Sequence, residues 1–98
     1  MTVLAIQESV EFSEWMQSLA DDKAAGRIQM RIARLKLGNP GDVEPVGHGV
    51  SEMRIDHGPG YRVYFVQRGQ KLIVVLGGGT ESTQTRDIKR AILLAGDL

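Results

Sequence analysis

Residues 50–77 contain three short runs in which apolar and polar side chains alternate, separated by two turns that contain glycine. Alternation with a period of two is typical of strands that bury one face against a core. The turn segments at 57–60 and 68–69 are short enough to join neighbouring antiparallel strands. We therefore predict strands near 50–56, 61–67 and 71–77. The apolar positions expected on the buried face are Met53, Ile55, Tyr61, Val63 and Phe65.

Helical spacing flanks this region on both sides. A first helix begins after the capping residue Ser9, and a second begins at Asp21 or Asp22. The second ends at Gly38, ahead of Pro40. A final helix begins at Ser82 or Thr83. The apolar residues at helical spacing are Phe12, Trp15, Met16 and Leu19 in the first helix, Ala25, Ile28, Ile32 and Leu35 in the second, and Ile88, Ala91, Ile92 and Ala95 in the last.

A short strand at 2–7 and a loop at 38–49 complete the predicted organisation. The element order is then β-α-α-β-β-β-α, in which a helical hairpin packs on a small, mostly antiparallel sheet. A length of 98 residues with 42% hydrophobic side chains suffices for one modest core. We therefore predict a single α+β domain over residues 1–98.

Composition excludes several classes of protein. The absence of cysteine rules out disulfides and thiolate metal sites, and it fits a reducing, cytoplasmic location. The start of the chain lacks the basic and apolar segments of a signal peptide. The longest unbroken apolar run, 72–76, is far too short to span a bilayer, so no membrane partner is expected.

Charge is unevenly distributed, although the formal net charge is zero. Residues 1–22 hold five acids and no base, whereas residues 23–37 hold five bases and no acid. Such separation creates local potentials in a neutral protein. The bases at helical spacing form either a solvated face or an RNA contact surface; they are Lys23, Arg27, Arg31 and Arg34.

The apolar pattern also predicts strand register. Pairing Ile55 with Tyr61 keeps the apolar residues of the first hairpin on one face, because opposed residues of antiparallel strands point the same way. The same register places Arg54 opposite Arg62 on the other face. A two-residue loop at 68–69 would pair Phe65 with Leu72 and Val63 with Val74. That second register would add Ile73 and Val75 to the face that carries the arginines and Tyr64.

Two opposed arginines beside an aromatic ring suit an anionic ligand that can stack, and RNA is one. Like charges directly opposed are destabilising, so the pair also invites neutralisation within the protein. Asp56, Glu52 or the chain's C-terminus are candidate partners. The residues alone leave an anion site and a structural pair open.

Four segments carry a resemblance to a known family: 31–35 (RIARL), 38–42 (GNPGD), 47–65 (GHGVSEMRIDHGPGYRVYF) and 77–84 (GGGTESTQ). With them, the whole chain resembles the RelE/ParE superfamily of toxins from toxin–antitoxin modules. The branch it looks like is the HigB-like addiction-module killer proteins. The predicted element order is also the order of that fold.

The resemblance implies a toxin that stops translation by cutting mRNA on the ribosome, with no metal and no cofactor. It also implies a cognate antitoxin, generally a helix-turn-helix protein. Arg62 matches the family's phosphate-stabilising arginine, Arg54 a strand position that is often basic, and Gln84 the branch motif. His57 is a fourth catalytic candidate, because histidine moves protons near neutral pH. The expected RNA contacts are Tyr64, Arg86, Arg31, Arg34, Lys23 and Arg27.

Two departures from the family pattern keep other functions open. Thr80 and Glu81 occupy the stretch where relatives usually carry a lysine, and the chain's end lacks the tyrosine or histidine of several active members. One alternative is a ParE-like toxin that poisons gyrase. Another is a catalytically weak toxin that acts mainly by binding its antitoxin and repressing its operon.

Overall fold

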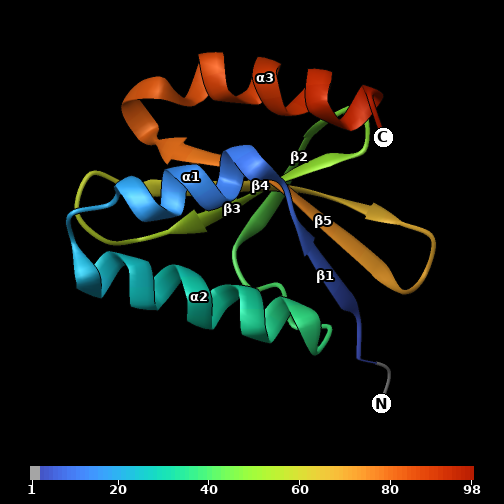
Figure 1. The fold of residues 1–98 in the computed structure, drawn as a ribbon, viewed down its shortest axis with the longest axis horizontal. Coiled ribbons are helices and arrows are strands. Elements are labelled where there is room, and N and C mark those ends of the chain that lie inside the picture. Colours follow the sequence, from blue (N-terminus) through green and yellow to red (C-terminus); the bar gives the residue numbers. More distant parts are fainter. Residues whose placement is uncertain (1–2) are drawn as a thin grey trace.

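The computed structural model describes residues 3–98, which form three α-helices and one five-stranded sheet in the order β1-β5-β4-β3-β2. The sheet lies between two helical layers, with α1 and α2 on one face and α3 on the other (Figure 1). The elements are β1 Ala5–Glu8, α1 Val10–Ser18, α2 Asp22–Lys36, β2 Val43–Gly47, β3 Val50–Ile55, β4 Tyr61–Arg68, β5 Leu72–Thr80 and α3 Gln84–Gly96. A 3-10 turn, Glu81–Thr83, leads into α3.

The helix starts follow the sequence signals. The Ser9 hydroxyl accepts a hydrogen bond from the backbone N–H of Phe12 at 3.0 Å and donates one to the carbonyl of Leu76 at 2.7 Å. The Asp21 carboxylate accepts hydrogen bonds from the backbone N–H groups of Lys23 and Ala24 in the first turn of α2. Both caps satisfy backbone donors that a helix leaves unpaired at its N-terminus. The predicted capping residues Ser9 and Asp21 are therefore confirmed.

The face under α1 and α2 is an apolar core. Phe12 and Ile28 are fully buried there against the sheet residues Met53 and Val63. The α2 stripe contains Ala24, rather than the predicted Ala25, because Ala24 is the residue that is fully buried. The register of the first hairpin is as predicted, with Ile55 opposite Tyr61.

The second hairpin differs from the prediction. Phe65 pairs with Val75 and not with Leu72, because the turn is longer than two residues. Tyr64 pairs with Gly77, so β5 holds one additional residue, Leu76, between these partners. Between the turn and this bulge, the register is shifted by three residues from the predicted one, and an odd shift exchanges the two faces of a strand. Ile73 and Val75 therefore lie in the α1–α2 core, and the prediction that placed them beside the arginines is wrong.

Two strand predictions also need correction. Residues 43–47, predicted as loop, form the edge strand β2, which pairs with β3 through an irregular register near Pro45. An edge strand tolerates proline because one side of its backbone needs no partner. The predicted strand at 2–7 appears as β1, parallel to β5, and Thr2 lies outside the described residues. Between residues 3 and 98, no helix has both the length and the apolar character needed to cross a membrane.

Candidate functional site

Arg54 and Arg62 are direct partners across β3 and β4 and project from the sheet face that α3 covers. This is the predicted juxtaposition. The next pair along the same two strands is Glu52 and Tyr64. Four polar side chains thus lie together on this face: the two arginines are opposite each other, and the Glu52 carboxylate is opposite the Tyr64 phenol. The N-terminal end of α3 adds Gln84 above them.

Glu52 is the centre of this cluster. Its side chain is 1% exposed, which is unusual for a carboxylate, and it is bonded on both oxygens. Oε1 faces the Nε atoms of Arg54 at 3.3 Å and Arg62 at 3.7 Å. Oε2 accepts a hydrogen bond from the Gln84 amide at 2.8 Å. Because a buried charge is costly without such partners, Glu52 fixes the positions of all three.

Arg54 is neutralised on every side. Besides Glu52, its guanidinium pairs with Glu44 and lies 3.8 Å from the Asp42 carboxylate, both from the neighbouring β2 region. Of the two interpretations left open by the sequence, Arg54 therefore fits neutralisation within the protein, and Glu52 is one of its three carboxylate partners. The two outer carboxylates are more than half exposed, so their attraction to Arg54 is screened by water.

Arg62 is held differently. Its side chain is only 14% exposed, yet its Nε atom is buried without a hydrogen bond, and its terminal nitrogens donate none within residues 3–98. A guanidinium has five N–H donors, and buried polar groups in proteins are nearly always paired. Arg62 therefore retains hydrogen-bonding capacity that an anion can use.

The Tyr64 side chain is fully buried, and its hydroxyl lies near Glu52 without a hydrogen bond of ordinary length. Burial, followed by the negative charge of Glu52, raises the pKa of this phenol well above its usual range. Tyr64 therefore remains neutral at physiological pH. Because the ring is covered, it supports the arginine pair from below and does not offer a stacking surface.

The β5–α3 junction is packed through adjacent glycines. A side chain at Gly78 would overlap the Trp15 ring, and one at Gly79 would overlap the Asp87 carboxylate. Asp87 accepts a hydrogen bond from the Thr83 hydroxyl and so holds the start of α3. Strand β5 therefore continues through the glycines beyond the predicted end at residue 77, and these glycines allow helices to approach both faces closely.

The remaining predicted site residues are divided between the two faces. Arg86 is on α3 but is 78% exposed, with an ion pair to Asp87 at 3.5 Å. His57 lies on the opposite side, where its Nε2 is 3.0 Å from the Asp21 carboxylate and its ring stacks on Tyr61. The prediction that grouped His57 with the arginines is therefore wrong, because the turn at 57–60 places it beside the start of α2.

The basic stripe of α2 is also remote from Arg62. Lys23, Arg27 and Arg34 are exposed on a helix that covers the other face of the sheet. Arg31 instead donates hydrogen bonds to three backbone carbonyls, those of Arg54, Pro40 and Asp42, and so ties the 38–42 loop to β3. The Arg31 guanidinium is therefore engaged in hydrogen bonds within the protein.

Comparison with known proteins places the chain in a family. No family model matches the sequence. An uncharacterised protein of Haemophilus influenzae is 43% identical over 95 residues, which covers 97% of this chain and 96% of the relative. The chain belongs to the family of that protein. The match extends over almost the whole length of both family members, so the sheet and its helical layers fall within it.

In this family member, sequence reasoning named Glu52 only as one possible neutralising residue, although it is the best-connected side chain of the cluster. The strand register could have identified it, because the register that opposes the arginines also opposes Glu52 and Tyr64.

No group of three His, Cys, Asp or Glu side chains within residues 3–98 is arranged to hold a metal ion. What the cluster offers chemically is fixed positive charge beside a buried carboxylate.

Proposed function

We propose that this chain is the toxin of a type II toxin–antitoxin module, a HigB-like member of the RelE/ParE superfamily that cleaves mRNA during translation. The observation that carries the proposal is Arg62, a nearly buried guanidinium that donates no hydrogen bond within residues 3–98 and whose Nε lies 3.7 Å from Glu52. A phosphodiester supplies the oxygens that such donors lack. The motif resemblance over 47–65, which includes Arg62, supports the same conclusion.

The proposed reaction is a transesterification within the RNA. The ribose 2′-hydroxyl loses its proton as its oxygen forms a bond to the adjacent phosphorus. The bond from phosphorus to the 5′-oxygen breaks and that oxygen takes up a proton, so the products are a cyclic phosphate and a 5′-hydroxyl. Arg62 stabilises the charge that develops on the non-bridging oxygens. Glu52 is a positioning residue, because its buried carboxylate lies 3.7 Å from the Arg62 Nε and supplies its counter-charge. The toxin would act in the cytoplasm, and its proposed inhibitor is a helix-turn-helix antitoxin.

A second candidate is favoured by the charges around the site. Arg54 and Arg62 face three carboxylates, Asp42, Glu44 and Glu52. Glu81 lies near Arg62, since its carboxylate and one Arg62 terminal nitrogen are both within 4 Å of the position that a Cβ at Gly60 would occupy. These acids weaken attraction to RNA. A toxin with little intrinsic cleavage, which acts mainly by binding its antitoxin and repressing its operon, is therefore the alternative.

Induction of the protein in cells, followed by mapping of mRNA 5′ ends, separates these functions. We expect new ends within translated frames that fall by about two to three orders of magnitude in Arg62→Ala, the usual effect of losing one donor to a developing oxyanion. Lys89→Ala is the matched control, because this exposed lysine on α3 has no ion pair within residues 3–98. Intact mRNA accompanied by DNA breaks would instead identify a gyrase poison. Intact mRNA and DNA with tight antitoxin binding would support the second candidate.

A further inference from the structure

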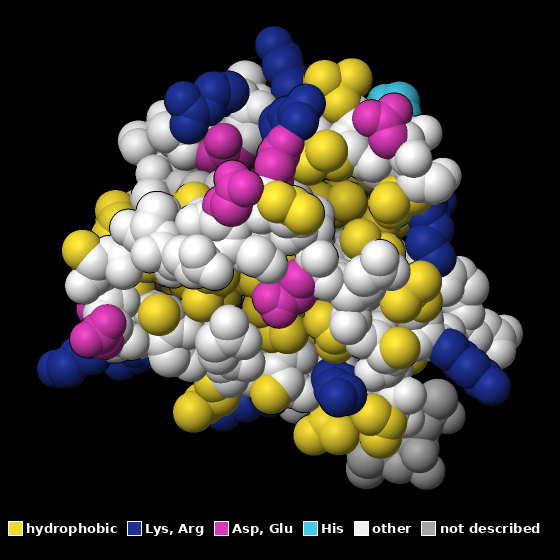
Figure 2. All heavy atoms as spheres, viewed as in Figure 1, with side chains coloured by type: hydrophobic (Ala, Val, Ile, Leu, Met, Phe, Trp, Pro, Cys, Tyr) yellow, Lys and Arg dark blue, Asp and Glu magenta, His cyan; other side chains and the backbone are white. Residues whose placement is uncertain are grey.

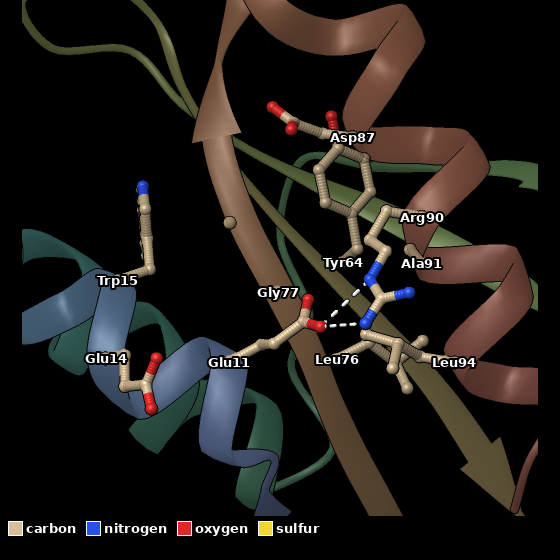
Figure 3. Close-up of a pocket in the computed structure, with 11 residues that line it drawn as sticks. Glu11, Glu14, Trp15, Tyr64, Leu76, Gly77, Asp87, Arg90, Ala91 and Leu94 are labelled. Carbon is tan, nitrogen blue, oxygen red and sulfur yellow. Dashed lines mark hydrogen bonds and ion pairs between the residues drawn. The ribbon is translucent and has the colours of Figure 1, made fainter.

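A pocket of about 320 Å³ lies between α1 and α3, and neither Arg54 nor Arg62 is among the residues that line it. Strand β5 forms its floor, α1 supplies Trp15 as a wall, and α3 closes the other side (Figure 3). Three carboxylates and one guanidinium line it, those of Glu11, Glu14, Asp87 and Arg90. Figure 2 shows acidic and basic side chains gathered along this α1–α3 side of the molecule. The pocket is therefore acidic overall, with an apolar floor.

One guanidinium already occupies the rim of this pocket. Arg90 extends from α3 across to α1, where both its Nε, at 2.9 Å, and one terminal nitrogen donate to the Glu11 carboxylate (Figure 3). This pairing lowers the pKa of Glu11 and leaves its side chain 42% exposed. Within the chain, a planar guanidinium therefore already pairs with one of the carboxylates that line the pocket.

Several groups in the pocket remain unused. Glu14 is exposed and makes no ion pair within the described residues. The Tyr64 ring is fully buried, and its unpaired hydroxyl points toward Asp87 at one end of the pocket (Figure 3). Gly77 faces open space, because a side chain there would meet no atom within 4 Å. Room, an unpaired buried hydroxyl and surplus negative charge thus coincide above Gly77.

We propose that this pocket receives an arginine side chain presented by a partner polypeptide. The alkyl stem of arginine fits the apolar floor, and its guanidinium fits the aromatic wall and the carboxylates. The pocket is open between two parallel rims of α1 and α3, so a bound free amino acid would be largely exposed. A polypeptide lying across the helices gains further contacts with both rims. The inference does not depend on RNA cleavage, because neither Arg54 nor Arg62 lines the pocket.

The single tryptophan of the chain, Trp15, gives a direct readout. The probe is the capped tripeptide acetyl-Gly-Arg-Gly-amide, titrated into the full chain while Trp15 fluorescence is followed. The matched control is the same peptide with citrulline, which keeps the shape of arginine and lacks its charge. We expect a saturable change with the arginine peptide and none with citrulline.

Three variants test the location and the chemistry. Gly77→Leu fills the pocket and should abolish the response, and unchanged circular dichroism would show that the fold is retained. Glu14→Gln should weaken binding about two- to fivefold, the range expected for an exposed charge pair. Arg90→Ala releases Glu11 from its internal partner and should strengthen binding by a similar factor. A purely structural Arg90 would give no such gain.

The proposal is overturned if the arginine and citrulline peptides behave alike, if no saturation occurs, or if Gly77→Leu binds normally. It is also overturned if spermidine, a flexible cation, binds as well as the arginine peptide, since that would indicate a general cation surface. Each of these results can be obtained whether or not the protein cleaves mRNA, so failure here leaves the proposed toxin activity intact.

Discussion

The two faces of the sheet differ in what they bury. Under α1 and α2, the sheet contributes apolar side chains, with Met53, Val63 and Val75 at full burial or nearly so. Under α3, apolar residues such as Val66 and Leu76 share the face with Glu52, the arginine pair and Tyr64. One face follows the ordinary rule for a protein core, and the other encloses a charged cluster.

This difference separates stability from function. An apolar face is stabilised by the area it removes from water, roughly 25 cal/mol per Å². A buried carboxylate with two arginines contributes little net stability, because desolvation offsets the attraction between the charges. Such a cluster contributes to holding its side chains in defined positions. The sheet face under α3 is therefore the one to test for activity.

Phe12→Ala should produce the largest loss of stability. Phe12 is fully buried, and replacing a buried phenylalanine by alanine costs about 3–5 kcal/mol of the free energy of unfolding. Denaturant unfolding measures this change. Val10→Ala on the same helix is the control, since Val10 is 73% exposed and should change stability by less than about 0.5 kcal/mol. Similar losses in both variants would contradict the assignment of this face as the main core.

Glu52→Gln should cost about 3 kcal/mol, because it leaves the Arg62 guanidinium nearly buried without a counter-charge. Glu44→Gln removes a more exposed carboxylate from the other side of Arg54 and should cost no more than about 1 kcal/mol. Thermal unfolding of the two variants in parallel checks the contrast. Equal effects would mean that Glu52 has no special role in holding the cluster.

Gly78→Ala tests the junction where both faces are approached by helices. The added methyl group would displace the Trp15 ring, and overpacking of this kind costs about 2 kcal/mol. Gly77→Ala, one residue earlier, enters open space and should be nearly neutral. Trp15 fluorescence together with denaturant unfolding distinguishes the variants. A neutral Gly78→Ala would show that Trp15 does not pack on β5 as described.

Tyr64→Phe should have its main effect at high pH. The folded protein raises the pKa of Tyr64, so above pH ~10 the unfolded chain releases a proton that the folded chain retains. Stability should therefore decline as pH rises beyond that point, and the decline should be smaller in Tyr64→Phe. Unfolding curves at increasing pH measure the difference. Identical pH dependence in the two proteins would contradict the buried, neutral phenol.

Sequence reasoning predicted the α+β architecture and the first hairpin because alternation there is strict. It missed β2, since Pro45 and the surrounding glycines are typical of loops and an edge strand tolerates them. It misplaced Ile73 and Val75 because the turn consists of residues 69–71, so that Phe65 pairs with Val75, three residues beyond the predicted partner Leu72. Local pattern does not determine the length of this turn.

The sequence likewise predicted only part of the candidate site. Arg54 and Arg62 were paired correctly because their register follows from neighbouring apolar residues. His57 was misassigned because a glycine-rich turn gives no periodicity from which to predict direction. The carboxylates of β2 at Arg54 could not be predicted once β2 itself had been taken as a loop.

The central claim is that Arg62, and not Arg54, has hydrogen-bond donors open to a phosphate. Nuclear magnetic resonance of the arginine Nε–H groups, during titration with a 2′-O-methyl dinucleotide that cannot be cleaved, tests it directly. The Arg62 signal should shift in a saturable manner while the signal of Arg54, surrounded by carboxylates, changes little. A titration that moves Arg86 or the α2 arginines and leaves Arg62 unchanged would contradict the account.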